Sequence, residues 1–163
     1  MKKQILNEST ALLKLERMAY EIVEQNLGEK ELLLAGIRGS GTTVAQVIRE
    51  QLERIAPFKI SSITIELDKK HPDEVVLSES LKMDGKVVIL ADDVSNSGKT
   101  MMYALKPFLS AHPRKIQTLV LVERTHKAFP VNFDFVGLSV ATTLQEQIVV
   151  EVEGNKIKGA YLE

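Results

Sequence analysis

The 163-residue sequence contains no cysteine, and no apolar run in it approaches the length needed to cross a bilayer. Without cysteine there is no disulfide framework and no thiol chemistry, which is consistent with the reducing cytosol. The first residues include Lys2 and Lys3 but lack the apolar core of a signal peptide. We therefore expect a cytoplasmic protein that does not enter a membrane.

The chain also lacks an excess of charge of either sign. Its formal net charge is −1, so no global basic field draws it to nucleic acid, although a local basic patch is not excluded. An apolar content of 44% is ordinary for a soluble globular protein. This length can bury a core without disulfides or metals, and no repeat or linker interrupts it. We expect a single domain spanning residues 1–163.

The most informative segment is residues 87–100, where an apolar run ends in Asp92 and Asp93 and a glycine- and hydroxyl-rich loop follows. The run predicts a buried parallel strand, and ligands bind beyond the carboxyl ends of such strands. The loop's N–H groups and hydroxyls, at the start of a helix, form a phosphate site. The two carboxylates suit a neighbouring sugar diol or a bridging Mg²⁺. The residues assigned to the phosphate are Ser95, Asn96, Ser97, Gly98, Lys99 and Thr100.

A second strand-to-helix turn lies between a predicted strand at 31–37 and a helical pattern at 42–55. Its two glycines permit close approach of an anion, and its arginine can grip a diphosphate with two parallel hydrogen bonds. A tight turn without a ligand is an equally good interpretation of this segment alone. The residues of this turn are Arg38, Gly39, Ser40 and Gly41.

Three more basic residues are candidates for the same site. Lys69 and Lys70 open a weakly periodic stretch, about residues 68–85, which we interpret as a mobile lid. Arg124 follows another predicted strand and should reach the same edge of the sheet. The alternatives are a solvated lysine pair and a surface ion pair between Arg124 and Glu123.

Strand and helix patterns alternate along most of the chain, which predicts an α/β fold with a Rossmann-like parallel sheet flanked by helices. A helix should begin at Asn7 or Ser9, and another should run from the phosphate loop to about residue 111. Short β-like runs after residue 135, two of them around a hairpin turn at 153–155, predict a small C-terminal β hood over the carboxyl edge, about 135–163. A short strand is also compatible with residues 74–78.

Residues 87–100 resemble the 5-phosphoribosyl-1-pyrophosphate (PRPP) motif of type I phosphoribosyltransferases. That motif has four apolar residues, two acids and a loop ending in Thr/Ser-Gly-x-Thr, here Ser97–Thr100. The resemblance implies transfer of phosphoribose from PRPP to a nucleobase with Mg²⁺ as cofactor. It implies catalytic roles for Asp92, Asp93, Lys69 and Lys70, and a pyrophosphate site at residues 38–41 with Arg124. A receiver domain also has an acidic pair after a strand, but this loop fits phosphate capture better than phospho-aspartate chemistry.

The segment at 123–137 resembles the PyrR family, as do residues 145–151 and 18–26. This second resemblance implies uracil as the acceptor, UMP as the product, and a homodimer or homotetramer. It also implies a nucleobase site around Phe135, Val136 and Gly137. The pyrophosphate loop departs from the family's Lys-Thr-Arg-Gly pattern.

RNA binding by the family's regulators uses basic residues, and few of those are retained here. Arg17 and Lys127 remain basic. Four other positions that are often basic in the family are occupied here by uncharged residues, namely Tyr20, Gln25, Asn132 and Leu138. Because RNA affinity depends on neutralising phosphates, we expect little RNA binding. Three alternatives stay open: a purine phosphoribosyltransferase, an RNA-binding regulator of pyrimidine genes, and a PRPP sensor without turnover.

Overall fold

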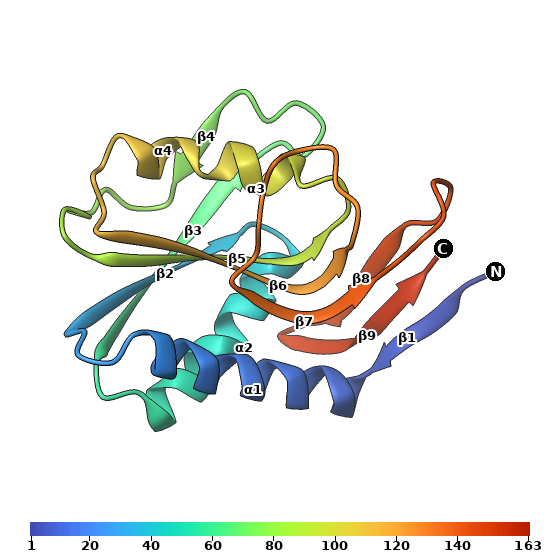
Figure 1. The fold of residues 1–163 in the computed structure, drawn as a ribbon, viewed down its shortest axis with the longest axis horizontal. Coiled ribbons are helices and arrows are strands. Elements are labelled where there is room, and N and C mark those ends of the chain that lie inside the picture. Colours follow the sequence, from blue (N-terminus) through green and yellow to red (C-terminus); the bar gives the residue numbers. More distant parts are fainter.

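The computed structural model describes all of residues 1–163, and a six-stranded sheet forms its centre (Figure 1). The strand order is β4-β3-β2-β5-β6-β7, with β4 antiparallel to β3 and every other neighbouring pair parallel. This confirms the predicted α/β class with a Rossmann-like parallel sheet. The strands are β2 (Glu31–Ile37), β3 (Lys59–Leu67), β4 (Val75–Leu77), β5 (Val87–Ser95), β6 (Lys115–Arg124) and β7 (Phe135–Val140).

Helices cover both faces of this sheet. On one face lie α1 (Glu8–Gln25) and α2 (Ser40–Ile55), and on the other α3 (Lys99–Ala104) and α4 (Lys106–Leu109) (Figure 1). Each face has its own apolar core: Leu34 and Ile89 point toward α1 and α2, while Leu33 and Leu90 point toward α3 and α4. Successive residues of the central strands therefore point alternately into the two cores. Because both positions are buried, these strands have continuous apolar sequences. No helix of the structure is both long enough and apolar enough to span a membrane.

Local sequence determines where the helices begin and end. The Asn7 side-chain oxygen accepts a hydrogen bond from the Thr10 N–H at 2.9 Å and caps α1, as predicted for one of two candidate residues. The helix expected to reach residue 111 is instead split into α3 and α4. Pro107, which has no N–H to donate, lies in the first turn of α4, where that loss is tolerated.

A separate three-stranded sheet has the order β1-β9-β8, formed by β1 (Lys3–Asn7), β8 (Ile148–Glu153) and β9 (Lys156–Leu162). It is the expected C-terminal β hood with different bounds. β7 pairs with β6 and so belongs to the central sheet, and its first residue, Phe135, packs in the main core. β1, which the sequence pattern did not reveal, joins in its place. The predicted β8–β9 hairpin is present.

The lid stretch contains β4, which pairs antiparallel with the end of β3 and confirms the short strand expected near residues 74–78. Residues 68–74 before it carry several exposed charged side chains. Motion of this stretch stays a prediction.

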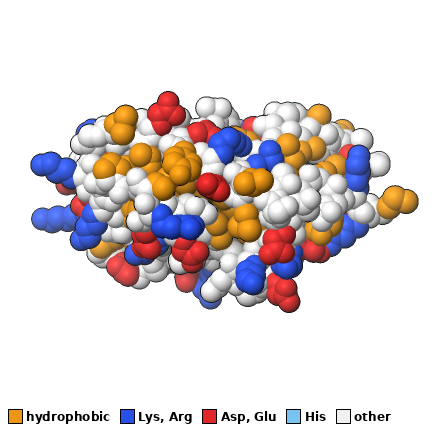
Figure 2. Space-filling view, turned by 90° about the horizontal axis from the view of Figure 1, so that it is seen from below, with side chains coloured by type: hydrophobic (Ala, Val, Ile, Leu, Met, Phe, Trp, Pro, Cys, Tyr) orange, Lys and Arg blue, Asp and Glu red, His pale blue; other side chains and the backbone are white.

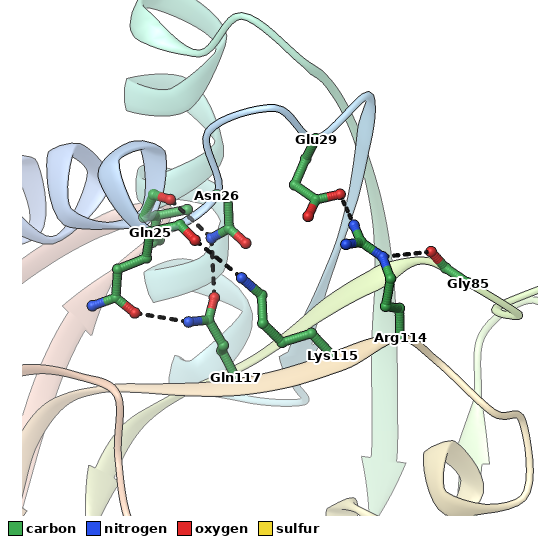
Figure 3. Close-up of polar contacts among 8 residues, drawn as sticks. Gln25, Asn26, Glu29, Gly85, Arg114, Lys115 and Gln117 are labelled. Atoms are coloured by element: carbon green, nitrogen blue, oxygen red, sulfur yellow. Dashed lines mark hydrogen bonds and ion pairs between the residues drawn. The ribbon is translucent and has the colours of Figure 1, made fainter.

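The opposite edge of the sheet, where the parallel strands begin, is fixed by a polar network (Figure 3). The buried Asn26 amide donates to the Ile22 carbonyl at 2.8 Å and to Gln117 Oε1 at 3.0 Å, and Gln117 Nε2 donates to Gln25 Oε1 at 2.8 Å. Lys115 donates to the Gln25 carbonyl at 3.0 Å. The end of α1 is thereby attached to β6.

Candidate active site

A cleft of about 130 Å³ opens at the carboxyl end of β5. Lys69 from the lid stretch, Asp92 and Val94 from β5, and the loop leading into α3 line it together with Phe133. The topology thus brings the acidic pair, the phosphate loop and one lid lysine to a single place. This is the edge at which parallel sheets bind ligands.

The acidic pair is buried, with Asp92 2% and Asp93 6% exposed. The Asp93 N–H donates to Asp92 Oδ1 at 2.9 Å, while Asp93 Oδ1 is buried without a hydrogen-bond donor. Lys69 Nζ lies 3.5 Å from Asp92 Oδ1 and 3.8 Å from Asp93 Oδ1. Burial, and then repulsion from Asp93, raises the pKa of Asp92 well above its ordinary value, and the Lys69 ammonium opposes this rise.

The phosphate loop is held by its own backbone and by the segment after β6. Gly98 has a φ of 85°, which favours glycine, and Ser97 Oγ accepts from the Lys99 N–H at 3.2 Å. The Ser97 carbonyl accepts from the N–H groups of Ala128 and Phe129, both at 3.0 Å. Ser95 Oγ is buried without a partner. The loop is therefore preorganised where it lines the cleft.

The second turn meets the first loop through Gly41, which packs against Asp92. Gly39, with a φ of 99°, and Ser40 lie at the start of α2. Arg38, by contrast, is exposed and pairs with Glu66 Oε1 at 2.9 Å in a neighbouring groove. The turn thus reaches the acidic pair through Gly41, and its arginine is engaged with Glu66.

Comparison with known proteins agrees with this arrangement. Residues 1–153 match the phosphoribosyl transferase domain. The chain belongs to the phosphoribosyltransferase family. It is 34% identical over 161 residues to the bifunctional protein PyrR of Enterococcus faecalis, covering 93% of this chain and 90% of that protein. It is 37% identical over 165 residues to the bifunctional protein PyrR of Ligilactobacillus salivarius, covering 94% and 93%.

Solved phosphoribosyltransferases have the same fold. A hypoxanthine-guanine phosphoribosyltransferase of Bacillus anthracis matches with a TM-score of 0.72 at 18% identity, covering 90% of this chain and 85% of that one. The hypoxanthine phosphoribosyltransferase of Trypanosoma cruzi matches with a TM-score of 0.75 at 14% identity, covering 85% and 82%. At such identities the likeness concerns the fold alone.

Several residues expected in the site of this phosphoribosyltransferase lie elsewhere. Lys70 donates its backbone N–H to Asp68 Oδ1 at 2.9 Å, and its ammonium makes no ion pair with the acids. Arg124 donates to Asn96 Oδ1 and to the Glu146 carbonyl, and it makes no hydrogen bond to the turn at residues 38–41. Lys70 is thus solvated, as the alternative interpretation of the lysine pair expected, whereas the surface ion pair between Arg124 and Glu123 does not form, because Glu123 pairs with Lys127.

The expected nucleobase residues also lie outside the cleft. Phe135 is fully buried in the core between β6 and α1. The carbonyls of Val136 and Gly137 accept from Arg17 Nη2, each at 3.0 Å. These backbone groups are therefore already bonded, and the prediction that they read a base finds no support in their surroundings.

Sequence reasoning missed Phe133 as a cleft residue. Its ring is 6% exposed, lines the cleft and lies 5.7 Å from Lys127 Nζ. It precedes Asp134, whose Oδ2 accepts from the Thr118 N–H at 2.8 Å, and it lies two residues before β7 begins at Phe135. The only sequence signal was an aromatic residue in a loop after a strand, which is too weak to identify a ligand contact.

Proposed function

We propose that the protein transfers the 5-phosphoribosyl group from PRPP to a nucleobase and releases pyrophosphate, with uracil as the acceptor and UMP as the product. The observation that carries this proposal is the shared cleft. Asp92 of the buried carboxyl pair, the preorganised phosphate loop and Lys69 line it together, and Asp93 Oδ1 lies 3.8 Å from the same Lys69 Nζ. A phosphate, a ribose diol and a leaving pyrophosphate need these three kinds of group side by side.

The loop at residues 95–100 would hold the 5′-phosphate. Backbone amides near Gly98 and the hydroxyls of Ser97 and Thr100 supply donors, and Lys99 supplies a positive charge at the same loop. These groups are fixed before substrate arrives, so little ordering entropy is lost on binding. The Asn96 side chain is instead hydrogen-bonded to Ile148 in β8.

The acidic pair would accept hydrogen bonds from the ribose hydroxyls. In their ionised forms, Asp92 and Asp93 would also stabilise the positive charge that develops at C1 as the bond to pyrophosphate breaks. Lys69 favours this ionised form, because its ammonium lies within 4 Å of both carboxylates. The two turns of the site cooperate here, since Gly41 allows α2 to approach the pair closely.

Magnesium is the proposed cofactor, and the donor set fits it. The buried Asp93 Oδ1 has no protein donor, and carboxylate oxygens are the hard ligands that Mg²⁺ prefers, usually one or two of them together with substrate phosphates. Asp92 and Asp93 would hold the ion beside PRPP. When bound, Mg²⁺ neutralises the diphosphate and assists its departure.

The lid stretch would close over the substrate. Lys69 would leave the acids when the ribose hydroxyls replace it, and its ammonium would then neutralise the departing pyrophosphate. Backbone amides of Gly39 and Ser40 would contact the same group at the start of α2. Closure would exclude water, which would otherwise hydrolyse the oxocarbenium-like centre.

The choice of uracil is supported by the PyrR relatives, whose identities of 34% and 37% extend over nearly the whole chain. The purine enzymes among the solved structures are more distant in sequence. A purine phosphoribosyltransferase is therefore the second candidate, with the same PRPP chemistry.

An RNA-binding regulator is disfavoured by the surroundings of the remaining cations. Arg17 pairs with Glu21 and donates to β7, and Lys127 pairs with Glu123 at 2.9 Å. Both charges are thus compensated within the fold, and RNA phosphates would have to compete with these contacts.

We also propose a homodimer or homotetramer. Apolar side chains on α1, including Leu13 and Tyr20, are 65% and 55% exposed. The side of the molecule that carries α1 and α2 shows apolar patches between charged groups (Figure 2). Light scattering coupled to gel filtration tests this proposal.

The deciding experiment incubates the purified protein with Mg²⁺, PRPP and, separately, uracil, hypoxanthine, guanine, adenine and orotate. Nucleotide formed and pyrophosphate released are both measured. UMP alone is expected. IMP or GMP instead would retain the PRPP mechanism and overturn the assignment of uracil. No product with any base, despite PRPP binding, would indicate a sensor or regulator.

A further inference from the structure

The Asn96 side chain joins the phosphate loop to the C-terminal sheet. Its Oδ1 accepts from the Ile148 N–H at 3.2 Å, and its Nδ2 donates to the Ile148 carbonyl at 3.4 Å. A side-chain amide has one acceptor and one donor side, so it can pair with a backbone residue as a neighbouring strand would. The Asn96 side chain therefore pairs with the backbone of β8, although the loop that carries it is distant from β8 in sequence.

Arg124 reaches the same point from the end of β6. Its Nη2 donates to Asn96 Oδ1 at 3.4 Å and to the Glu146 carbonyl. Its Nε is buried without a partner, and both of these contacts are made by Nη2. We call Asn96, Arg124, Glu146 and Ile148 the Asn96 junction.

The junction is anchored on its far side by the core. Ile148 is 2% exposed and packs with Val150 and Ile157 in the main apolar cluster. The Gln147 N–H and carbonyl exchange hydrogen bonds with Glu163 at 2.8 and 3.0 Å, which extends the β8–β9 pairing by one residue. Asn96 is thus bonded to a fixed part of the molecule, and its own backbone lies in the loop that faces the cleft.

We propose that Asn96 is a positioning residue that holds the phosphate loop in its binding conformation by anchoring it to β8. This inference rests on the proposed function, in which residues 95–100 bind the 5′-phosphate of PRPP. The Asn96 side chain does not touch the phosphate. It acts through the backbone amides of the loop, whose direction depends on where residue 96 is held.

This role has a kinetic signature. The 5′-phosphate does not react, so its contacts are the same in the ground state and the transition state, and their loss raises KM for PRPP with little change in kcat. A general loosening of the fold would instead lower the fraction of active protein. That effect would reduce apparent kcat and Tm while KM for PRPP stayed the same.

The test compares Asn96→Ala with Gln145→Ala. Gln145 is an exposed amide residue in the connection between β7 and β8 and makes no hydrogen bond, so it is a matched control. Asn96→Ala should raise KM for PRPP by about three- to tenfold, the range expected from losing one or two neutral hydrogen bonds, and should change kcat by less than about twofold. Gln145→Ala should change neither. An unchanged KM for PRPP in Asn96→Ala would overturn the inference.

Two further readouts do not depend on turnover. Calorimetric binding of PRPP without a base should show the same loss of affinity, and amide exchange at Ile148 should be faster in Asn96→Ala than in the parent protein. If the parent binds PRPP but forms no nucleotide, the proposed function fails and this comparison still decides the inference. Equal PRPP affinity or equal Ile148 exchange in the two proteins would overturn it.

Arg124 provides an independent check of the junction. A double-mutant cycle with Asn96→Ala and Arg124→Met should be non-additive, because both changes remove the same anchoring of the loop to β8. Additive effects on PRPP affinity would mean that the two residues act separately and would overturn the junction as a unit.

Discussion

Gly41 lies directly against Asp92: a Cβ on Gly41 would stand 2.7 Å from Asp92 Oδ1 and 3.2 Å from Asp92 Cα. The beginning of α2 therefore depends on a hydrogen at this position to approach the acidic pair. We expect Gly41→Ala to displace the Asp92 carboxylate and to lower kcat about tenfold to a hundredfold, since small misplacements of catalytic groups have effects of this size. Steady-state kinetics measures the loss, and circular dichroism with Tm reports whether the fold is kept. Near-normal kcat in a folded variant would contradict this role.

Lys69 should determine the pH at which the acidic pair becomes ionised. Its ammonium opposes the rise in the pKa of Asp92, so Lys69→Met should raise that pKa further and shift the acid limb of the pH–kcat/KM profile to higher pH. Lys70→Met is the matched control. The Lys70 ammonium makes no ion pair with Asp92 or Asp93, so this variant should leave the acid limb where it is in the parent protein. Equal shifts in both variants would argue against a specific effect of Lys69.

Asp92→Asn should stabilise the protein at neutral pH while reducing turnover. The pKa of Asp92 is raised in the folded state, so its contribution to stability is present below the unfolded-state pKa and is lost as pH rises through the folded-state pKa. The asparagine does not ionise and avoids this loss. At neutral pH we expect Tm to rise by about 2–4 °C for each kcal/mol by which the free energy of unfolding increases. The difference in Tm between variant and parent should shrink toward zero in acid. Thermal melts from about pH 4 to about pH 8 measure it, and a variant less stable than the parent at neutral pH would refute it.

Gln117→Leu should destabilise the fold without altering catalysis. Gln117 accepts from the buried Asn26 amide at 3.0 Å, and its loss leaves that donor with one partner fewer inside the protein. A decrease of about 1–3 kcal/mol in the free energy of unfolding is expected from denaturant titration. Because this network lies at the far edge of the sheet (Figure 3), KM for PRPP should not change in protein that remains folded. A changed KM would indicate coupling between the two edges.

The sequence was sufficient for the central strands, the cap at Asn7 and the β5 loop, because each is encoded within a short window. An apolar run predicts a buried strand, and the side-chain oxygen of an asparagine caps the helix that begins at the next residue. Pro107 also acted locally, but its effect on the helix after the loop was overlooked.

What could not be predicted depends on contacts between distant segments. Arg124 and Asn96 are both polar residues at strand ends, and nothing in their neighbourhoods says that they meet each other and β8 rather than a ligand. Phe135 was expected near a base through the family resemblance, which does not say which side of its strand faces the core. Which side meets α1 depends on the pairing of β7 with β6.

The pairing of β1 with β9 joins Lys3 to Leu162, close to the widest separation in the sequence that this chain allows. Contacts between such remote segments form late in folding, since the entropy of closing the intervening loop opposes them until other structure has shortened it. The central sheet uses nearer partners and can assemble first. β1 would then be the last strand added to the small sheet, so protection of the Lys3–Asn7 amides should emerge in refolding only after the bulk of the secondary structure has formed.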